Sequence, residues 1–214
     1  MPVGAPHLVT AGSSGDNAAA GLNGDVLESP WYPDLAALGL YGRVFTASQA
    51  IAGVAPGTSG TTTTPALTVY NATKPIYLAF VKLVYVSGTI GAGSISFARQ
   101  IMAAAPTGGT AITPYATNGA GTTNTVCGTG HTVTAIAAAA DRYPLIDLPA
   151  TLATAAAAGV GAWAQSIIAP VHAWLAATEV GMIYGIAAGG STPLVRMTAV
   201  FVDDPRVTAL AAAA

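Results

Sequence analysis

The longest run of strand-forming residues in the chain extends from residue 76 to residue 86, and it is apolar on both faces. The run reads IYLAFVKLVYV, and its β-branched and aromatic side chains favour a pleated, half-buried surface. Side chains alternate between the two faces of a strand. One predicted face carries Ile76, Leu78, Phe80, Lys82, Val84 and Val86, and the other carries Tyr77, Ala79, Val81, Leu83 and Tyr85. A strand with one solvated face alternates apolar with polar residues, so we expect the second face to meet another subunit.

A second strand is predicted from residue 94 to residue 101, after a turn that is rich in glycine. The turn, SGTIGAG at residues 87–93, supplies three glycines for the positive φ angles of a tight reversal. The strand SISFARQI then alternates a small polar face with a larger face. This pattern predicts that residues 76–86 and 94–101 form a β-hairpin.

Further short strands follow the same alternation, and turn residues separate them. In the strand at 165–175, Pro170 cannot donate to a sheet ladder, which indicates a sheet edge or a β-bulge. We expect the last two strands to pair with each other as a closing hairpin. The predicted strands lie at residues 68–71, 131–137, 165–175, 180–187 and 193–202. Residues 44–54 are expected to form a strand pair or an edge strand, and residues 141–149 to be extended between prolines. About eight short strands with almost no helix predict an all-β fold, an antiparallel β-sandwich or jelly roll.

The sequence divides into an arm, a sandwich domain and a tail. Residues 1–42 are rich in Gly, Ala, Ser and Asn and predict an extended arm, with one short helix near residues 31–39. Residues 43–205 form the predicted sandwich, and residues 206–214 form a flexible tail. The apolar residues of the short helix are expected to dock either on their own domain or on a partner. They are Trp31, Tyr32, Leu35 and Leu38.

The chain is poor in charge. Only 7% of its residues are charged, against about 25% in typical soluble domains. Charged surface residues keep free monomers dispersed. A surface with so few charges therefore indicates a subunit of an assembly. The alternative is a monomer whose surface consists of Thr, Ser, Asn and Gly. A formal net charge of −2 with no cluster of Lys or Arg argues against nucleic acid. No run of about 18 strongly apolar residues predicts a membrane span, and no secretory signal is predicted.

The sequence indicates no active site, no metal site and no cofactor. Cys127, His131 and Asp141 are residue types that can form a nucleophile, a base and an orienting acid, but their spacing matches no such motif. His7 and His172 lie far from His131 and have no acids or cysteines at metal-ligand spacing. We therefore expect a protein that is not an enzyme.

Two lone cations interrupt apolar strands, Lys82 in the first strand and Arg196 in the last. An unpaired charge is costly to bury, so each side chain either reaches solvent at the rim or pairs with an acid of another subunit. The predicted interface therefore combines the arm, the second strand face and these cations. It consists of Trp31, Tyr32, Leu35, Leu38, Tyr77, Val81, Lys82, Leu83, Tyr85 and Arg196.

Several turn-and-strand motifs resemble those of a family of tailed-bacteriophage virion proteins. The motifs are GRVF at residues 42–45, AGVAPGT at 52–58, LTVYN at 67–71, YVSGTIGAG at 85–93 and GSTPLV at 190–195, followed by an apolar strand and DDP at 203–205. The turn around Lys74 is shorter than in that family. The resemblance covers roughly residues 33–205 and contains no catalytic motif.

The resemblance implies a jelly-roll decoration (cement) protein of the phage head. Such a protein would bind the lattice of the major capsid protein as a homotrimer, on the outer surface of the virion. The alternative is a tail or fibre component that binds carbohydrate. In that case exposed aromatic residues such as Trp163 and Trp174 would be expected in the binding site.

Overall fold

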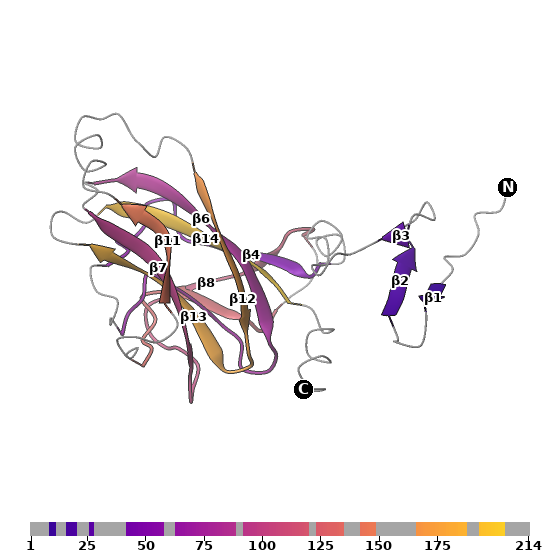
Figure 1. Ribbon diagram of the computed structural model, residues 1–214. Helices are drawn as coiled ribbons and strands as arrows, with labels where there is room; N and C mark the ends of the chain where they lie inside the picture. Colours follow the sequence, from indigo (N-terminus) through magenta and orange to yellow (C-terminus); the bar gives the residue numbers. More distant parts are fainter. Residues whose placement is uncertain are drawn as a thin grey trace. The chain divides into compact units, whose positions relative to one another are not determined.

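In a computed structural model, the chain forms two compact units, Met1–Leu38 and Gly39–Ala214. The described residues are 9–11, 16–20, 26–27, 42–57, 63–88, 92–119, 123–134, 142–148, 166–187 and 193–203. The fold is visible in Figure 1.

The first unit contains a small antiparallel sheet in the order β1–β2–β3. Its strands are β1 (Val9–Ala11), β2 (Asp16–Ala20) and β3 (Val26–Leu27). The sequence predicted no strand here, because runs of two to five residues are too short to show alternation. The predicted short helix, with Trp31, Tyr32, Leu35 and Leu38, lies outside the described residues.

The second unit contains two antiparallel sheets, which we call the β6 sheet and the β7 sheet. The β6 sheet has the strand order β12–β6–β14–β4–β9. Its strands are β12 (Ile167–Leu175), β6 (Ile76–Ser87), β14 (Leu194–Val202), β4 (Val44–Ser48) and β9 (Tyr115–Ala116).

The β7 sheet has the strand order β11–β7–β13–β5–β10–β8. Its strands are β11 (Arg142–Leu148), β7 (Gly93–Ile101), β13 (Glu179–Ala187), β5 (Leu67–Tyr70), β10 (Val126–Thr129) and β8 (Thr110–Ile112). The predicted strand at residues 131–137 is reduced, within the described residues, to an isolated bridge at Thr132.

Eight of these strands have the connectivity of a jelly roll. Within the β6 sheet the order is β4–β14–β6–β12, and within the β7 sheet it is β5–β13–β7–β11. Each sheet therefore pairs early strands of the domain with late ones, which is the double Greek key arrangement of a jelly roll. The predicted fold class, an all-β antiparallel sandwich, is confirmed.

The two predicted hairpins are wrong. Strand β6 pairs with β12 and β14, whereas β7 pairs with β11 and β13. In the same way β13 and β14 lie in different sheets. Each glycine-rich connection therefore carries the chain from one layer of the sandwich to the other. Local sequence identifies a reversal, but it does not show whether the next strand pairs beside the first or packs across the core.

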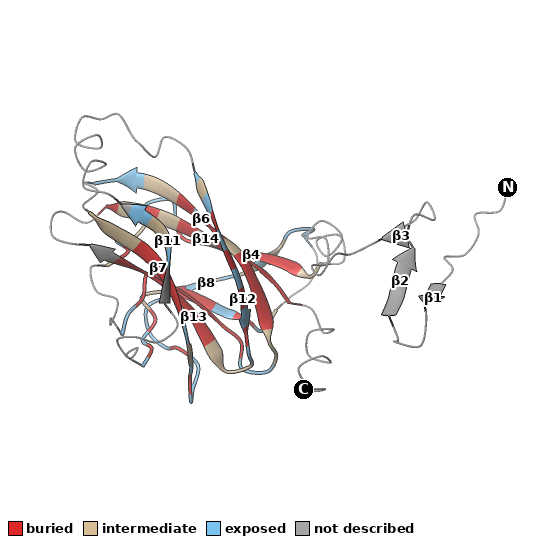
Figure 2. Ribbon diagram, in the orientation of Figure 1, coloured by how far each residue is buried: buried red, intermediate tan, exposed pale blue. Residues whose placement is uncertain are grey.

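The two sheets pack face to face around one apolar core. Residues from both sheets form it, including Leu83 and Ile76 of β6, Phe97 of β7 and Ile183 of β13. The rings of Phe45 and Phe201 stack at a centroid distance of 5.8 Å. Figure 2 shows these buried positions in red along the central strands. Burial of large apolar side chains between two sheets is the main favourable term for such a fold.

A β-bulge in β6 changes which face of the strand points into the core. Along β14, Val200 pairs with Phe80 and the next residue, Phe201, pairs with Leu78, so that Ala79 is the extra residue. An extra residue reverses the alternation beyond it. Inward positions are therefore Ile76 and Leu78 before the bulge, and Val81 and Leu83 after it.

The proline in β12 has both of the features that the sequence offered as alternatives. Strand β12 lies at the edge of its sheet, and the register with β6 shifts between Pro170 and Ala173. Within this bulge His172 has a φ of 49°. Because Pro170 cannot donate a ladder hydrogen bond, the edge and the bulge are the places that tolerate it.

The outer face of the β7 sheet has an apolar cluster that other parts of the same unit cover. It comprises Tyr70, Ala98, Met102, Val133, Val180, Met182 and Tyr184. The Val133 amide donates a hydrogen bond to the Thr63 carbonyl at 2.8 Å, which fixes the position of this segment. The seven side chains of this cluster are therefore buried within the chain itself.

A buried glutamine ties the two sheets together. The Gln49 amide nitrogen donates to the Ala66 carbonyl at 2.7 Å and to the Thr129 hydroxyl at 3.0 Å, beside the β7 sheet. Its carbonyl oxygen accepts from the Met197 amide of β14 at 2.9 Å. The residue is 3% exposed, so water cannot replace these partners.

We predict that Gln49→Met lowers the free energy of unfolding by about 1–3 kcal/mol for each backbone group left without a partner. Methionine has a similar length but cannot form the three hydrogen bonds. Urea unfolding followed by circular dichroism measures the change, with the exposed Thr110→Ala as the matched control. Equal stability of Gln49→Met and the control would contradict the role given to this side chain.

Candidate functional site

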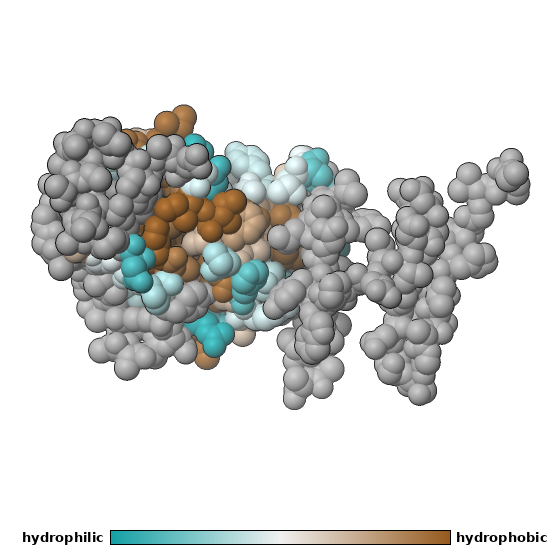
Figure 3. Space-filling view, turned by 45° about the horizontal axis from the view of Figure 1, so that its top comes forward, coloured by the Kyte–Doolittle hydropathy of each residue, from teal (hydrophilic) through white to brown (hydrophobic). Residues whose placement is uncertain are grey.

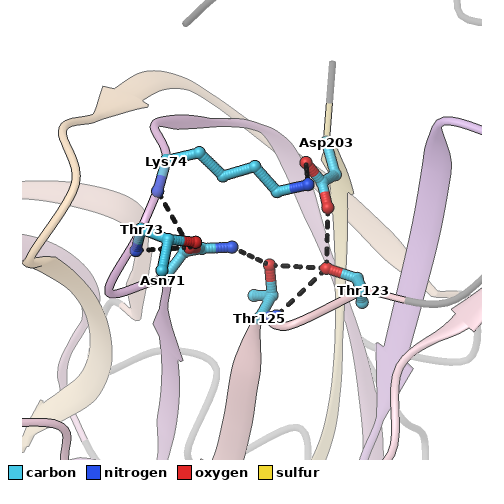
Figure 4. A network of polar contacts seen from close by, with 6 residues as sticks. All are labelled: Asn71, Thr73, Lys74, Thr123, Thr125 and Asp203. Carbon is cyan, nitrogen blue, oxygen red and sulfur yellow. Dashed lines mark hydrogen bonds and ion pairs between the residues drawn. The ribbon is translucent and has the colours of Figure 1, made fainter. Parts of the chain in front are cut away.

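A buried polar network joins three loops at one end of the sandwich (Figure 4). The Asn71 side-chain oxygen accepts from the amides of Thr73 and Lys74 at 2.9 and 3.1 Å, which fixes the turn between β5 and β6. Its nitrogen donates to the Thr125 hydroxyl at 3.0 Å. The Thr123 hydroxyl lies 2.9 Å from that of Thr125 and 2.8 Å from Asp203 Oδ2.

An ion pair completes this network. Lys74 Nζ lies 2.6 Å from Asp203 Oδ1, with the aspartate side chain 2% exposed and the lysine side chain 27% exposed. The sequence predicted only that Asp203 ends the last strand. The pair was missed because its members are far apart in the sequence. The network connects β5, β6, β10 and β14, so we assign it to stability of the fold.

Of the residue types that could supply nucleophilic chemistry, Cys127 and His131 are described, and they form no hydrogen bond with each other. Burial raises the pKa of Cys127 to about 12, so its thiol stays protonated near neutral pH and is a poor nucleophile. His131 Nδ1 lies 2.9 Å from the Thr68 hydroxyl, and its ring packs where a side chain on Gly128 would be, 2.0 Å from an added Cβ. Burial also lowers the pKa of His131. Asp141 lies outside the described residues.

Two further findings concern metals and membranes. Among the described residues, no group of three or more His, Cys, Asp or Glu side chains is placed to hold a metal ion. In the same part of the chain, no helix has the length and apolar character needed to cross a bilayer.

The outer face of the β6 sheet is the candidate interaction surface. Because of the bulge, its side chains beyond Ala79 are Phe80, Lys82 and Val84. The register with β14 shifts a second time beside Val86, so the alternation does not assign that residue to a face. The edge strand β12 adds Ile168, which is 61% exposed and directly opposite Lys82. In the space-filling view, apolar side chains gather in one area of the described surface with hydrophilic residues around it (Figure 3).

This face carries two cations and, among the described residues, no carboxylate. Lys82 is exposed and forms no hydrogen bond or ion pair with a described residue. Arg196 donates to the Ser48 hydroxyl at 2.9 Å and to the Gln49 carbonyl at 3.1 Å, both neutral groups. Its guanidinium is therefore held in position without an opposite charge.

The remaining predicted interface residues of this sheet differ in burial and in the face on which they lie. Val81 and Leu83 are fully buried in the core of their own domain, because the bulge turns them inward, so they are removed from the proposed interface. Tyr85 is half-buried and packs partly against the same core. Tyr77 is on the outer face but only 7% exposed.

An aromatic cluster lies at the β12 edge of this face. The Trp174 ring is 4.8 Å from the Tyr77 ring, and the tryptophan is 46% exposed. The Tyr77 hydroxyl lies 2.6 Å from His172 Nδ1. Trp163, the other predicted aromatic candidate, lies outside the described residues.

Comparisons of the chain with protein families, with curated proteins and with solved structures find no match.

We predict that Lys74→Met destabilises the protein by about 2–4 kcal/mol. Removal of one partner of a fully buried ion pair typically costs about 3–5 kcal/mol. The expected cost here is somewhat lower, because Lys74 is partly exposed. Asp203→Asn should cost less, since asparagine leaves no buried charge. The double variant should lose less stability than the sum of the two single losses. A double-mutant cycle in urea measures this difference. Strict additivity would contradict direct pairing of the two side chains.

We also predict that Cys127 resists alkylation by iodoacetamide at about pH 8 in the folded protein and reacts readily in urea. The physical reasons are its burial and its raised pKa. Mass spectrometry of the intact chain counts the labels. Rapid labelling under native conditions would show that the thiol is accessible and reactive.

Proposed function

We propose that this chain is a structural protein of a tailed-phage virion, a decoration protein that binds the head as a homotrimer. Its partners would be further copies of itself and the major capsid protein, on the outer surface of the capsid. The observation that carries the proposal is the outer face of the β6 sheet, where Ile168 is 61% exposed and lies opposite the exposed Lys82. Exposed apolar area next to unpaired charge is typical of a surface that a partner covers.

The composition and the fold support the same proposal. Only 7% of the residues are charged, which is low for a chain that must stay dispersed as a monomer. Jelly rolls occur in viral capsid proteins, but also in lectins and cupins, so the fold alone leaves the role open. The motif resemblance at residues 42–58, 67–71, 85–93 and 190–195 favours the virion among these classes.

The proposal gives no catalytic role to any residue. Cys127 is protonated near neutral pH because of its raised pKa, and His131 is 4% exposed. The charged side chains of Lys74 and Asp203 pair with each other. These groups support the fold, so the function is expected to lie in surface contacts.

The second candidate is a tail or fibre component that binds carbohydrate. It is favoured by the exposed Trp174 ring beside Tyr77 and His172, because a flat aromatic surface next to a polar group is suited to a sugar ring. A Trp174→Ala variant separates the two candidates. Loss of binding to a glycan array with unchanged binding to heads would favour this second role.

We predict that the purified chain sediments as a trimer at micromolar concentration and that it co-sediments with undecorated phage heads. Deletion of residues 1–38, the first compact unit, should leave the trimer intact and abolish binding to heads. Sedimentation velocity and head pull-down measure the two properties. A monomer at micromolar concentration would contradict the homotrimer. We assign binding of the capsid protein to this first unit, so undiminished head binding after the deletion would contradict that assignment.

A further inference from the structure

Two exposed charges in the second unit have opposite signs and no partner among the described residues. They are Lys82 on β6 and Asp147 on β11. The other acids whose side chains are described in this unit are already paired, Glu179 with Arg99 at 3.6 Å and Asp203 with Lys74 at 2.6 Å. Within the described part of the chain, Lys82 and Asp147 are therefore two exposed, unpaired side chains of opposite charge.

The two charges lie on different surfaces of the sandwich. Lys82 belongs to the outer face of the β6 sheet, where it is opposite Ile168 on one side and Thr198 on the other. Asp147 is in β11, the edge strand of the β7 sheet, where it is opposite Ser94. Exposed Pro144 and half-buried Leu145 and Ile146 lie next to it along the strand. Each charge thus has apolar neighbours.

Charge also excludes one mode of self-association for the β6 sheet. Arg196 is opposite Val84, so it is a diagonal neighbour of Lys82, at a distance of roughly 7–8 Å. A twofold contact of this face with itself would bring Lys82 and Arg196 of two copies together. Like charges placed opposite each other oppose association. The face therefore fits a different surface, one that carries negative charge.

We propose that a second copy of this chain covers the outer face of the β6 sheet, with its β11 edge and Asp147 against Lys82. Such a head-to-tail contact joins two different surfaces, and it closes into a ring when its rotation allows. The ring is the homotrimer of the proposed function, on which this inference rests. Ile168 of one copy would then be buried against the β11 strand of the next.

Charge reversal tests this contact in the full-length chain. Lys82→Glu places Glu opposite Asp147, and Asp147→Lys places two lysines together, so each variant should raise the dissociation constant of the oligomer about tenfold or more. The double variant Lys82→Glu/Asp147→Lys restores opposite charges and should return it close to the wild-type value. Sedimentation velocity over a dilution series at low salt measures the constants, because salt screens the pair.

Two control variants separate charge from structure. Lys82→Met removes the cation without adding a repulsive charge, so its effect should be smaller than that of Lys82→Glu. Thr110→Glu adds an acid at an exposed position of β8, the opposite edge of the β7 sheet, and should leave association unchanged. Thermal unfolding of every variant confirms that each chain is folded.

The inference is overturned if a wild-type trimer keeps its dissociation constant in both single variants, or if the double variant is as weak as the single ones. Either result leaves the proposed function intact, since the trimer would exist with another contact. A wild-type monomer contradicts both the inference and the homotrimer. An open polymer in place of the trimer contradicts the closed ring.

Discussion

The β-bulge at Ala79 in the central strand β6 determines both the core and the exposed surface of the sandwich. Without the extra residue, the strand would present Ile76, Leu78 and Phe80 to one side in unbroken alternation. With it, the core receives side chains from both halves of β6, and Lys82 is turned outward. Bulges re-aim side chains in this way and increase local twist. The outward position of Lys82 in the candidate interaction surface therefore follows from this bulge.

Buried polar groups hold the layers that this bulge helps to pack. Gln49 crosses between the sheets with three hydrogen bonds, and the Lys74–Asp203 pair closes one end of the sandwich. Each of these contacts costs desolvation, and each is satisfied almost entirely within the protein, which makes the arrangement specific. The buried charge of Asp203 is thus paired within the domain. The charges of Lys82 and Asp147, which are unpaired among the described residues, lie at its surface.

Strand positions could be predicted from the sequence, because alternation and β-branched residues are local properties. The runs that became β6, β7, β12 and β14 are examples. Pro170 indicated an edge or a bulge, and the structure has both. Strand partners could not be predicted, since a glycine-rich connection looks the same whether it forms a hairpin or crosses to the other sheet. The bulge was hidden because Ala79 and Phe80 are both apolar.

The candidate surface was only partly predictable for the same reason. Lys82 and Arg196 were identified as unusual cations, and both lie on the outer face. Val81 and Leu83 were assigned to the wrong side because a period of two was extended through the bulge. Ile168, Asp147 and the ion pair of Lys74 depend on contacts between distant segments, which one sequence does not specify.

Under the proposed function, this chain would cover the phage head in many copies. Quantitative mass spectrometry of purified virions, with the major capsid protein as the internal reference, measures its copy number directly. The account predicts a fixed ratio to the capsid protein, with a copy number of the same order. A copy number as small as that of tail proteins, or absence from purified particles, would contradict it.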